Sequence, residues 1–521
     1  PLVLDAQNRL YLHRLYEHER ALADALVHRL EGPAMQPMQP AVQLLRGRFA
    51  HAAERPDWQQ VACASALLGR LTVLSGGPGT GKTTTVVSLL AILLAQEPDL
   101  RIALCAPTGK AAARMVQSIA GRAADLPEDL RTRLPSEALT VHRLLGFMPR
   151  EGRFRHHAGA PLGCDVLIVD EASMLDLALA RRLVDALPLH ARLILIGDKD
   201  QLASVEAGAV FSQLSAQRAL ADDQRRQIAA LCELPVDALD EVPDAPADSL
   251  ATRVCWLTRN FRFQAQPAIG RLAQTVRDGD AAGTLDVLEQ ADGTGLRWLD
   301  HALDMDAAAA EIDRGYADYW RLLETGQRDP AALFAALGRF RVLCAQREGP
   351  ASVAQFNRLA RHRLRQALGD AGLGAAETDR LPGEALMMRG NDYALALFNG
   401  DMAIVLPDAQ GVLHGVFERG PQDWLWVPLA RLPQLDPAFA MTVHKSQGSE
   451  FDAVLVALPQ DITPLCTREL LYTGITRARA QVTLAASRTL IDHAVTHPTR
   501  RSGGLPDRLR EAALLKARAA P

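Results

Sequence analysis

The sequence Gly76-Gly77-Pro78-Gly79-Thr80-Gly81-Lys82-Thr83 lies between an apolar run at 71–75 and a helical pattern at 83–96. It fulfils the pattern G-x-x-x-x-G-K-[ST], in which glycines let backbone N–H groups surround phosphates and the following helix N-terminus favours negative charge. We expect Lys82 to reach the β- and γ-phosphates and Thr83 to ligate Mg²⁺. The sequence therefore predicts an ATP site made by this loop and its helix start: Gly76, Gly77, Pro78, Gly79, Thr80, Gly81, Lys82, Thr83 and Thr84.

Strand-like and helix-like segments alternate on both sides of this loop. Short apolar runs at 71–75, 101–106, 165–169 and 192–196 are separated by longer helical stretches such as 83–96 and 110–120. Strands separated by helices indicate βαβ units and a mostly parallel sheet. Ligands of such sheets bind at the carboxyl ends of the strands, which is where the phosphate loop lies.

An acidic pair follows one of these strands. Asp170 and Glu171 come directly after the apolar run 166–169. A carboxylate at this position holds Mg²⁺, and its neighbour orients and deprotonates the attacking water. We therefore expect Asp170 to be a metal-binding residue and Glu171 to be the catalytic base of nucleotide hydrolysis.

Composition sets limits on the class of protein. The 521 residues are 48% hydrophobic and 23% charged, which is typical of a soluble globular protein of two to four domains. No apolar run approaches the roughly 20 residues of a membrane span, and the start at Pro1 lacks a secretory pattern. The seven cysteines are scattered without a Cys-x-x-Cys pair, which favours the reducing cytoplasm over disulfides or zinc. The net charge of −4 does not indicate a nucleic-acid binder, but a locally basic groove is enough to track a single strand.

A series of further motifs carries a family resemblance. In chain order they are Trp58-Gln59, Ala106-Pro107-Thr108-Gly109-Lys110-Ala111-Ala112, Thr140-Val141-His142-Arg143-Leu144-Leu145, Gly197-Asp198-Lys199-Asp200-Gln201-Leu202, Asn260-Phe261-Arg262-Phe263, Met441-Thr442-Val443-His444-Lys445-Ser446-Gln447-Gly448-Ser449-Glu450-Phe451 and Tyr472-Thr473-Gly474-Ile475-Thr476-Arg477-Ala478-Arg479. The series resembles the superfamily-1 DNA helicases of the 5′→3′ branch, and within them the RecD family, from about residue 57 to about residue 490.

The resemblance implies roles for four residues around the nucleotide. Gln59 matches the glutamine that reads the adenine edge, and Gln201 matches the sensor of the γ-phosphate. Arg262 and Arg477 match two arginines that stabilise transition-state charge, and Arg477 is expected from the second α/β domain. The pair Asn260-Phe261 departs from the Ser-Tyr usual before the first arginine, so a hydroxyl is lost there.

The resemblance also implies a groove for single-stranded DNA. Polar side chains and helix N-termini in these segments bind phosphates without reading the base sequence. The expected DNA contacts are Thr108, Lys110, His142, Thr442, His444 and Lys445. For the two histidines, a purely structural role is the alternative.

The implied fold is α/β, with two RecA-like P-loop NTPase domains that have parallel sheets. Glycines punctuate short strands between residues 381 and 432, which indicates a small antiparallel β-barrel inserted into the second domain. The expected layout is a helical, partner-docking segment at 1–50, a first RecA-like domain at 51–335, a second at 336–380 and 433–521, and the inserted barrel at 381–432.

The resemblance implies a cytoplasmic, ATP-dependent 5′→3′ DNA helicase or translocase. It would work with RecB- and RecC-like subunits on the ends of double-strand breaks during recombination repair. The nuclease reaction of that complex, exodeoxyribonuclease V, is expected from the partner, since this sequence has no spare carboxylate cluster with a lysine for it. The alternatives are a stand-alone RecD-like or relaxase-type helicase, and a nucleotide-switched assembly scaffold.

Overall fold

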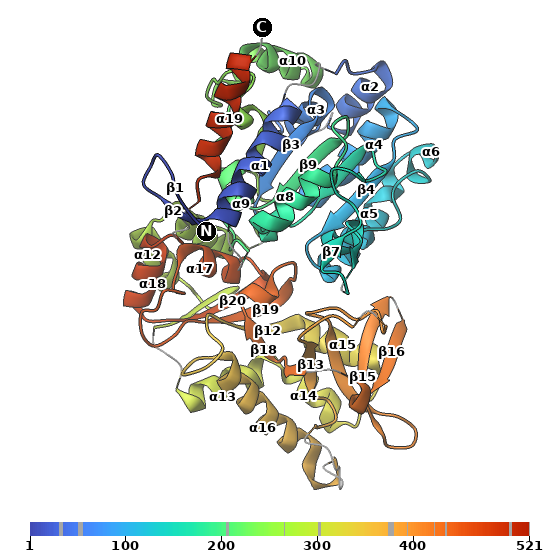
Figure 1. The fold of residues 1–521 in the computed structure, drawn as a ribbon. Coiled ribbons are helices and arrows are strands. Elements are labelled where there is room, and N and C mark those ends of the chain that lie inside the picture. The colour runs from blue at the N-terminus through green and yellow to red at the C-terminus, as the bar shows by residue number, and fades with distance from the viewer. Residues whose placement is uncertain are drawn as a thin grey trace. The chain divides into compact units, whose positions relative to one another are not determined.

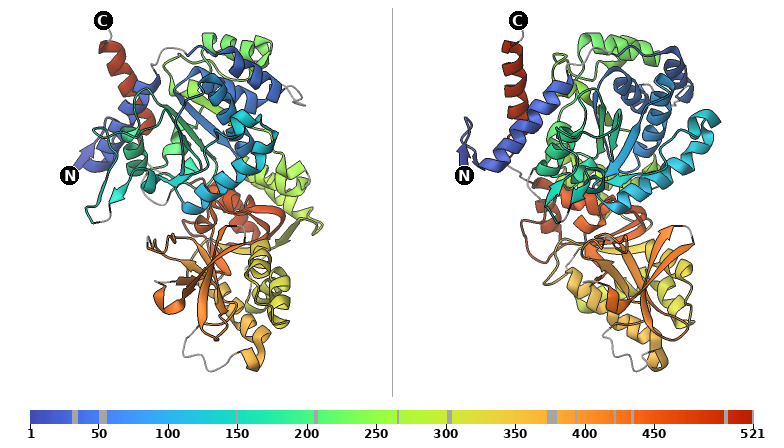
Figure 2. Two further views of the ribbon diagram at one scale, coloured as in Figure 1. Left: turned by 90° about the vertical axis from the view of Figure 1, so that its right-hand side faces the viewer. Right: turned by 45° about the vertical axis from the view of Figure 1, so that its right-hand side comes forward.

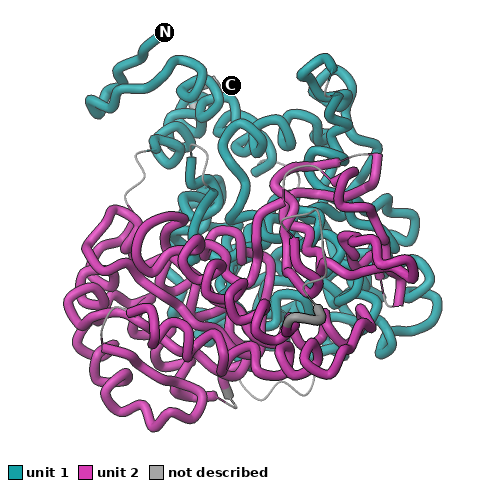
Figure 3. The backbone as a smooth tube through the Cα atoms, turned by 90° about the horizontal axis from the view of Figure 1, so that it is seen from below, with its two compact units in different colours: residues 1–261, 500–521 teal, residues 262–499 magenta. Residues whose placement is uncertain are grey.

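The protein is described by a computed structural model. It covers residues 1–30, 35–49, 56–148, 150–204, 208–264, 266–300, 304–372, 380–392, 394–420, 422–432, 435–499 and 503–519. The chain divides into two compact units, which Figure 3 distinguishes by colour: unit 1 is Pro1–Phe261 with Arg500–Pro521, and unit 2 is Arg262–Thr499. Within the described ranges, none of the helices combines the length and the apolar character that a membrane crossing requires.

Unit 1 contains a six-stranded sheet in which every strand is parallel to its neighbours. The strand order is β10-β3-β9-β8-β4-β5. The predicted parallel sheet is therefore confirmed. The strands are β3 (Leu71–Gly76), β4 (Ile102–Ala106), β5 (Leu139–Thr140), β8 (Val166–Val169), β9 (Arg192–Gly197) and β10 (Val254–Leu257).

Helices cover both faces of this sheet, as Figures 1 and 2 show. Successive residues of β8 alternate between the two cores: Val166 and Ile168 join one, and Leu167 and Val169 join the other. Burial on both faces explains why the central strands are continuous apolar runs. The first core is covered by α2 (Gln39–Arg48), α3 (Trp58–Leu68), α4 (Lys82–Gln96), α5 (Gly109–Arg122), α6 (Glu128–Arg131) and α10 (Asp222–Cys232), and the second by α1 (His13–Leu30), α8 (Leu177–Ala186), α9 (Val210–Leu214) and α19 (Leu505–Ala519).

The two ends of the chain meet within unit 1. A hairpin of β1 (Leu2–Leu4) and β2 (Leu10–Leu12) precedes α1, and α19 packs along α1. The Gly504 N–H donates to the Glu19 carboxylate at 3.0 Å, and the Arg508 guanidinium lies 3.5 Å from that of Asp5. The helical N-terminal segment is confirmed by α1 and α2, whereas the hairpin was not predicted.

Unit 2 contains a second parallel sheet of five strands, in the order β11-β20-β19-β12-β18. These strands are β11 (Leu296–Leu299), β12 (Phe340–Cys344), β18 (Ala440–Thr442), β19 (Phe451–Ala457) and β20 (Ala478–Ala485). The helices of unit 2 are α11 (Pro267–Asp278), α12 (Ala281–Glu289), α13 (Met305–Gly315), α14 (Ala317–Glu324), α15 (Pro330–Arg339), α16 (Val353–Gly372), α17 (Arg468–Ile475) and α18 (Arg488–Thr496).

The insertion predicted within the second α/β domain is present as an antiparallel sheet. Its strands follow the order β16-β15-β14-β13-β17 around a small apolar core of their own. In the described part of the chain no pairing joins β16 to β17, so the sheet is open and not a closed barrel. The strands are β13 (Ala385–Met388), β14 (Met402–Pro407), β15 (Leu413–Gly420), β16 (Asp423–Pro428) and β17 (Leu435–Pro437).

The units differ from the expected domain bounds at two places. The division falls between Phe261 and Arg262 and not near residue 335, because β11 pairs with β20 while α11 and α12 pack on α17 and α18. The last helix, α19, belongs to unit 1 and not to the second domain, because it packs on α1. Both differences come from contacts between segments about 190 to 490 residues apart, which local patterns do not reveal.

Candidate nucleotide and DNA-binding site

The phosphate loop connects the end of β3 to the start of α4. Gly79 and Gly81 adopt φ angles of 85° and 83°, in the left-handed region that favours glycine. A Cβ atom on Gly81 would lie 2.2 Å from Gln59 Nε2, and one on Gly76 would lie 2.4 Å from Thr80 Oγ1. Only glycine therefore fits the close packing of this turn at these two positions.

Lys82 folds back over the loop from the first turn of α4. Its Nζ donates to the carbonyl oxygen of Gly76 at 2.6 Å. The Thr80 hydroxyl donates to the carbonyl oxygen of Gly77 at 2.8 Å, which closes the turn below it. The lysine charge is close enough to two carboxylates, Asp170 and Asp198, to oppose the rise in pKa that burial causes in both. The predicted loop residues thus lie in the strand–loop–helix setting that their motif requires.

Asp170 and Glu171 follow β8, which is separated from β3 only by β9. Burial raises the pKa of Asp170 to about 6, and the negative charge of Glu171 adds to this rise. The positive charge of Lys82 opposes it. Glu171 adopts φ 51°, an uncommon conformation for a residue with a side chain. Its Oε2 atom is buried without a hydrogen-bond partner among the described residues. This strained turn holds a buried carboxylate oxygen that can accept a hydrogen bond from a ligand or water.

Gln201 lies beyond β9. It is held by Asp198, which was not among the predicted site residues. The Gln201 Nε2 donates to Asp198 Oδ2 at 3.0 Å, while the backbone N–H of Asp200 donates to Asp198 Oδ1 at 3.1 Å. Burial raises the pKa of Asp198, and Lys82 opposes the rise. The Gln201 Oε1 has no partner in the described structure although it is buried. Asp198 therefore positions the glutamine that was expected to sense the γ-phosphate.

Gln59 lies against the phosphate loop from the first turn of α3. Asp57 caps this helix by accepting from the Gln59 backbone N–H at 2.8 Å. The Gln59 side chain is buried, and its Nε2 donates to the carbonyl oxygen of Thr80 at 3.2 Å. The structure thus brings Gln59 to the nucleotide loop, and its contact with adenine stays a prediction.

The segment after β10 is hydrogen-bonded to the same phosphate loop. The Asn260 Nδ2 donates to the carbonyl oxygen of Pro78, and the Phe261 backbone N–H donates to that of Gly79, both at 2.8 Å. The asparagine that departs from the family pattern therefore makes a hydrogen bond of its own to the phosphate loop. The signal that could have identified this contact was an amide side chain located just beyond the end of a strand.

The two expected arginines lie in unit 2. Arg262 pairs with Glu450, and the same carboxylate accepts from Arg479 Nε at 3.3 Å. Arg477 is almost fully buried, with its Nε donating to the Thr473 carbonyl at 3.2 Å and its Nη1 to that of Ser449 at 3.3 Å. Glu450 was not among the predicted site residues, although it stands inside the motif that contains His444 and Lys445. A role of either arginine on ATP stays a prediction.

Three of the expected DNA contacts follow two neighbouring strands of unit 1, β4 and the edge strand β5. Thr108 comes after β4 and caps α5, its hydroxyl accepting from the Ala111 N–H at 3.2 Å, and the exposed Lys110 lies in the first turn of that helix. His142 comes after β5, which pairs with β4. Reduced solvation lowers the pKa of His142, with Arg182 adding to the effect and Asp176 opposing it. These side chains therefore share the carboxyl edge that also holds the phosphate loop.

The other three expected DNA contacts lie at the end of β18 in unit 2. The Thr442 hydroxyl accepts from the backbone N–H of Lys445 at 3.3 Å, and the Lys445 Nζ lies 3.2 Å from the Asp436 carboxylate. His444 occupies the short turn between them and is partly exposed. Within unit 2 the structure brings these residues together; their binding to DNA stays a prediction.

Comparison with known proteins agrees with this geometry. Residues 59–207 match a family model described as an AAA domain, and residues 437–485 match a UvrD-like helicase C-terminal domain. The first match contains the phosphate loop, the acidic pair and Gln201. The second contains the β18 turn and Arg477. The chain therefore contains an AAA-type segment that carries the phosphate loop and a shorter segment similar to the C-terminal domain of UvrD-like helicases.

Individual relatives are similar over most of the chain. The RecBCD enzyme subunit RecD of Mycolicibacterium smegmatis is 37% identical over 515 residues, which cover 96% of this chain and 82% of that protein. The RecD subunit of Haemophilus influenzae is 32% identical, covering 89% and 74%. The ATP-dependent RecD2 DNA helicase of Deinococcus radiodurans is 31% identical, covering 92% and 56%. A crystal structure of Bacteroides Pif1 bound to ssDNA is 16% identical, covering 88% and 94%, with a TM-score of 0.43. The identities to the RecD subunits over most of both chains show that this chain belongs to the RecD family.

Proposed function

We propose that this chain is an ATP-dependent 5′→3′ DNA helicase that works as the RecD subunit of a RecBCD-type complex. The observation that carries the proposal is the set of charges around the phosphate loop. Lys82 lies near two carboxylates with raised pKa values, while Glu171 Oε2 and Gln201 Oε1 are buried without partners in the described structure. Buried polar atoms without partners are costly, so a ligand that completes them is favoured.

ATP with Mg²⁺ fits this set of donors. The Thr83 hydroxyl and the Asp170 carboxylate are hard oxygen ligands of the kind that Mg²⁺ prefers. When bound there, Mg²⁺ would neutralise part of the phosphate charge. The described residues include no group of three or more His, Cys, Asp or Glu side chains able to hold a metal. Mg²⁺ is usually held by one or two carboxylates together with the phosphates of a nucleotide.

The remaining residues complete a cycle of hydrolysis and movement. Glu171 takes the proton of the attacking water, and Gln201, positioned by Asp198, responds to the γ-phosphate. Arg262 and Arg477 of unit 2 stabilise the transition-state charge in the ATP-bound state. Thr108, Lys110, His142, Thr442, His444 and Lys445 hold the backbone of a single strand, and their grip alternates with the nucleotide state.

The family indicates the setting of this motor. Its relatives are named as subunits of the RecBCD enzyme, so we propose RecB- and RecC-like partners, DNA ends as the substrate and the cytoplasm as the location. The similarity to a RecD2 helicase favours a motor that works without these partners as the second candidate. Co-purification with RecB and RecC, followed by unwinding of 5′- and 3′-tailed duplexes, distinguishes the two.

The test of the motor is Lys82→Gln. The substitution removes the charge that holds the phosphates, so DNA-stimulated ATP hydrolysis should fall by roughly a hundredfold or more. Lys516→Gln, in α19 of the same unit, is the control and should leave turnover unchanged. A Lys82→Gln protein that hydrolyses ATP at the parent rate would show that the proposed chemistry is wrong.

A further inference from the structure

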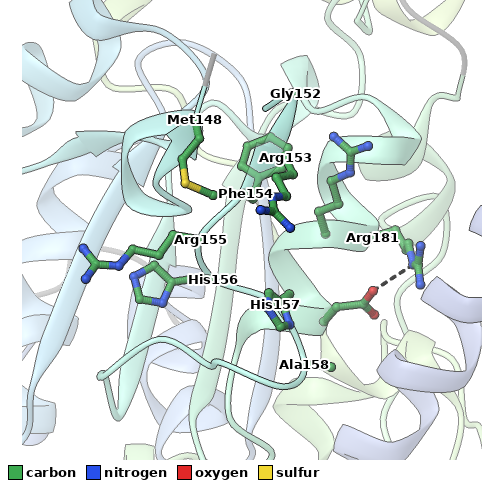
Figure 4. A pocket seen from close by; sticks show the side chains of 11 residues that line it. Met148, Gly152, Arg153, Phe154, Arg155, His156, His157, Ala158 and Arg181 are labelled. Carbon is green, nitrogen blue, oxygen red and sulfur yellow. Dashed lines mark ion pairs between the residues drawn. The ribbon is translucent and has the colours of Figure 1, made fainter. Parts of the chain in front are cut away.

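A basic pocket lies in unit 1 outside the phosphate loop. It is formed by the hairpin of β6 (Phe147–Met148) and β7 (Arg153–Phe154), by the loop that follows, and by α8. Figure 4 shows the Phe154 ring with Arg155 and His156 on one side and Arg181 on the other. The cavity measures about 580 Å³, within the range of roughly 300–1,000 Å³ in which nucleotide-sized ligands are bound.

The charge of this pocket is opposite to that of the chain. The whole chain has a net charge of −4, yet four arginines line the pocket against one carboxylate, Asp185. Arg153 pairs with Glu151 at 2.5 Å and Arg181 with Asp185 at 2.8 Å. No ion pair with a carboxylate joins Arg155 or Arg182 within the described ranges, and both side chains are exposed. Two guanidinium groups therefore contribute positive charge that no carboxylate among the described residues pairs with.

Contacts within unit 1 hold the backbone of Arg155 and the guanidinium of Arg182. The backbone N–H groups of Arg155 and His156 donate to the carbonyl oxygens of Gly146 and Leu145, each at 3.0 Å. The Arg182 guanidinium carbon lies 4.9 Å from the centre of the Phe154 ring, in a cation–π contact. A site whose donors are already held needs less ordering when it binds an anion.

The pocket also continues the surface on which DNA contacts were expected. The His142 ring lies 5.8 Å from the rings of both Phe147 and Phe154, centre to centre. His142 follows β5, next to the Thr108 segment after β4. The aromatic cluster of His142, Phe147 and Phe154 therefore joins the expected DNA surface to Arg182 and Arg155.

We propose that this pocket binds the phosphate backbone of single-stranded DNA, with Arg155 and Arg182 as the phosphate contacts. Arginine presents planar, permanently charged donors that suit phosphate oxygens. A flexible single strand can place one nucleotide in a cavity of this size, whereas a stiff duplex cannot bend into it. The inference rests on the proposed function, and it extends the strand-binding surface beyond the residues that the family motifs supply.

The test measures binding of a fluorescein-labelled oligothymidylate to the full chain by fluorescence anisotropy at several salt concentrations. Arg155→Gln/Arg182→Gln should weaken binding roughly five- to twentyfold at low salt, and the slope of log K against log[salt] should fall by about 1.4, or 0.7 per lost phosphate contact. Arg155→Lys/Arg182→Lys keeps the charges and should recover most of the affinity. Arg122→Gln/Arg226→Gln removes two charges from exposed positions of the same unit and should bind as the parent does.

The outcomes separate this inference from the proposed function. If the parent chain neither binds the oligonucleotide nor hydrolyses ATP in response to it, the proposed function fails. If the parent binds but the Arg155→Gln/Arg182→Gln protein binds equally well with the same salt slope, only the pocket is overturned. A salt slope of the Lys variant that falls as far as that of the Gln variant overturns it too, because the loss would then not follow the charge. Thermal unfolding of each variant verifies that it is folded.

Discussion

The candidate nucleotide-site residues of the two units are held in different ways. In unit 1, the ends of β3, β8 and β9 bring Lys82 near two carboxylates and leave Glu171 Oε2 and Gln201 Oε1 buried without partners in the described structure. In unit 2, the candidate arginines already have protein partners: Arg262 has Glu450, and Arg477 has two backbone carbonyls. Unit 1 thus presents acceptors that need a ligand, whereas unit 2 presents donors that are already engaged.

This difference indicates that ligand binding and the conditional action of the arginines are assigned to different units. Polar atoms without partners in a fixed turn favour ligand binding, since a ligand removes their desolvation cost. Arginines already paired must exchange partners before they act on a phosphate, which makes their action conditional. We therefore expect substitutions in unit 1 to abolish chemistry, and substitutions in unit 2 to change when chemistry occurs.

The largest expected effect comes from Glu171→Gln. The substitution keeps the shape of the side chain but removes its basicity, so the kcat for ATP should fall by about 10²- to 10⁴-fold. Binding of a fluorescent ATP analogue should persist, because Lys82 and the loop are intact. Glu128→Gln, at an exposed position of α6, is the control. Turnover that survives in the Glu171→Gln protein would remove Glu171 from its role as the base.

A smaller effect is expected from Arg262→Lys. Lysine keeps the charge but loses the planar donors, so DNA-stimulated kcat should fall roughly ten- to a hundredfold. Arg479→Lys is a matched control, because Arg479 contacts the same Glu450 carboxylate and is half-exposed. Steady-state ATPase assays of both proteins show whether the loss is specific to Arg262 or common to the two arginines that contact Glu450. Equal losses would mean that the Glu450 pairing matters for structure and that Arg262 has no special role toward ATP.

The smallest effect concerns stability at low pH. The Arg101 guanidinium beside Asp165 holds the pKa of that carboxyl below its usual range, so the carboxylate stabilises the fold above the unfolded value of about 3.9. This contribution is lost as the pH falls through the folded pKa. Because Arg101 is exposed, we expect only about 0.5–1 kcal/mol between the parent and Asp165→Asn at pH 7.

Thermal unfolding at pH 7 and at about pH 3 measures this difference. The parent should be the more stable protein at pH 7, and the gap should shrink in acid. A gap that is constant with pH would mean that the Asn variant is destabilised by its lost backbone contacts alone.

Much of the nucleotide site was predictable because its motifs are local. Residues 76–84 contain their own turn, glycines and helix start, and Asp170 directly follows an apolar strand. The packing of Gln59 against Thr80 depends on how α3 packs against the phosphate loop, whereas the hydrogen bond from Gln201 to Asp198 joins residues only three positions apart. Asn260 shows the limit most clearly: its contact with Pro78 joins residues 182 positions apart, and the sequence indicated only the loss of a hydroxyl.

The sequence by itself determined that this chain has a phosphate loop, parallel α/β sheets, an antiparallel insertion and the motif order of a helicase. These features follow from residue patterns that repeat over a few positions, such as the glycine spacing and the apolar strands. Only the tertiary structure decided that residues 262–335 belong with the second sheet, that α19 returns to α1, and that Arg155 and Arg182 share a pocket with Phe154. Each of these features depends on contacts between segments distant in sequence, and a local residue pattern does not indicate how favourable such contacts are.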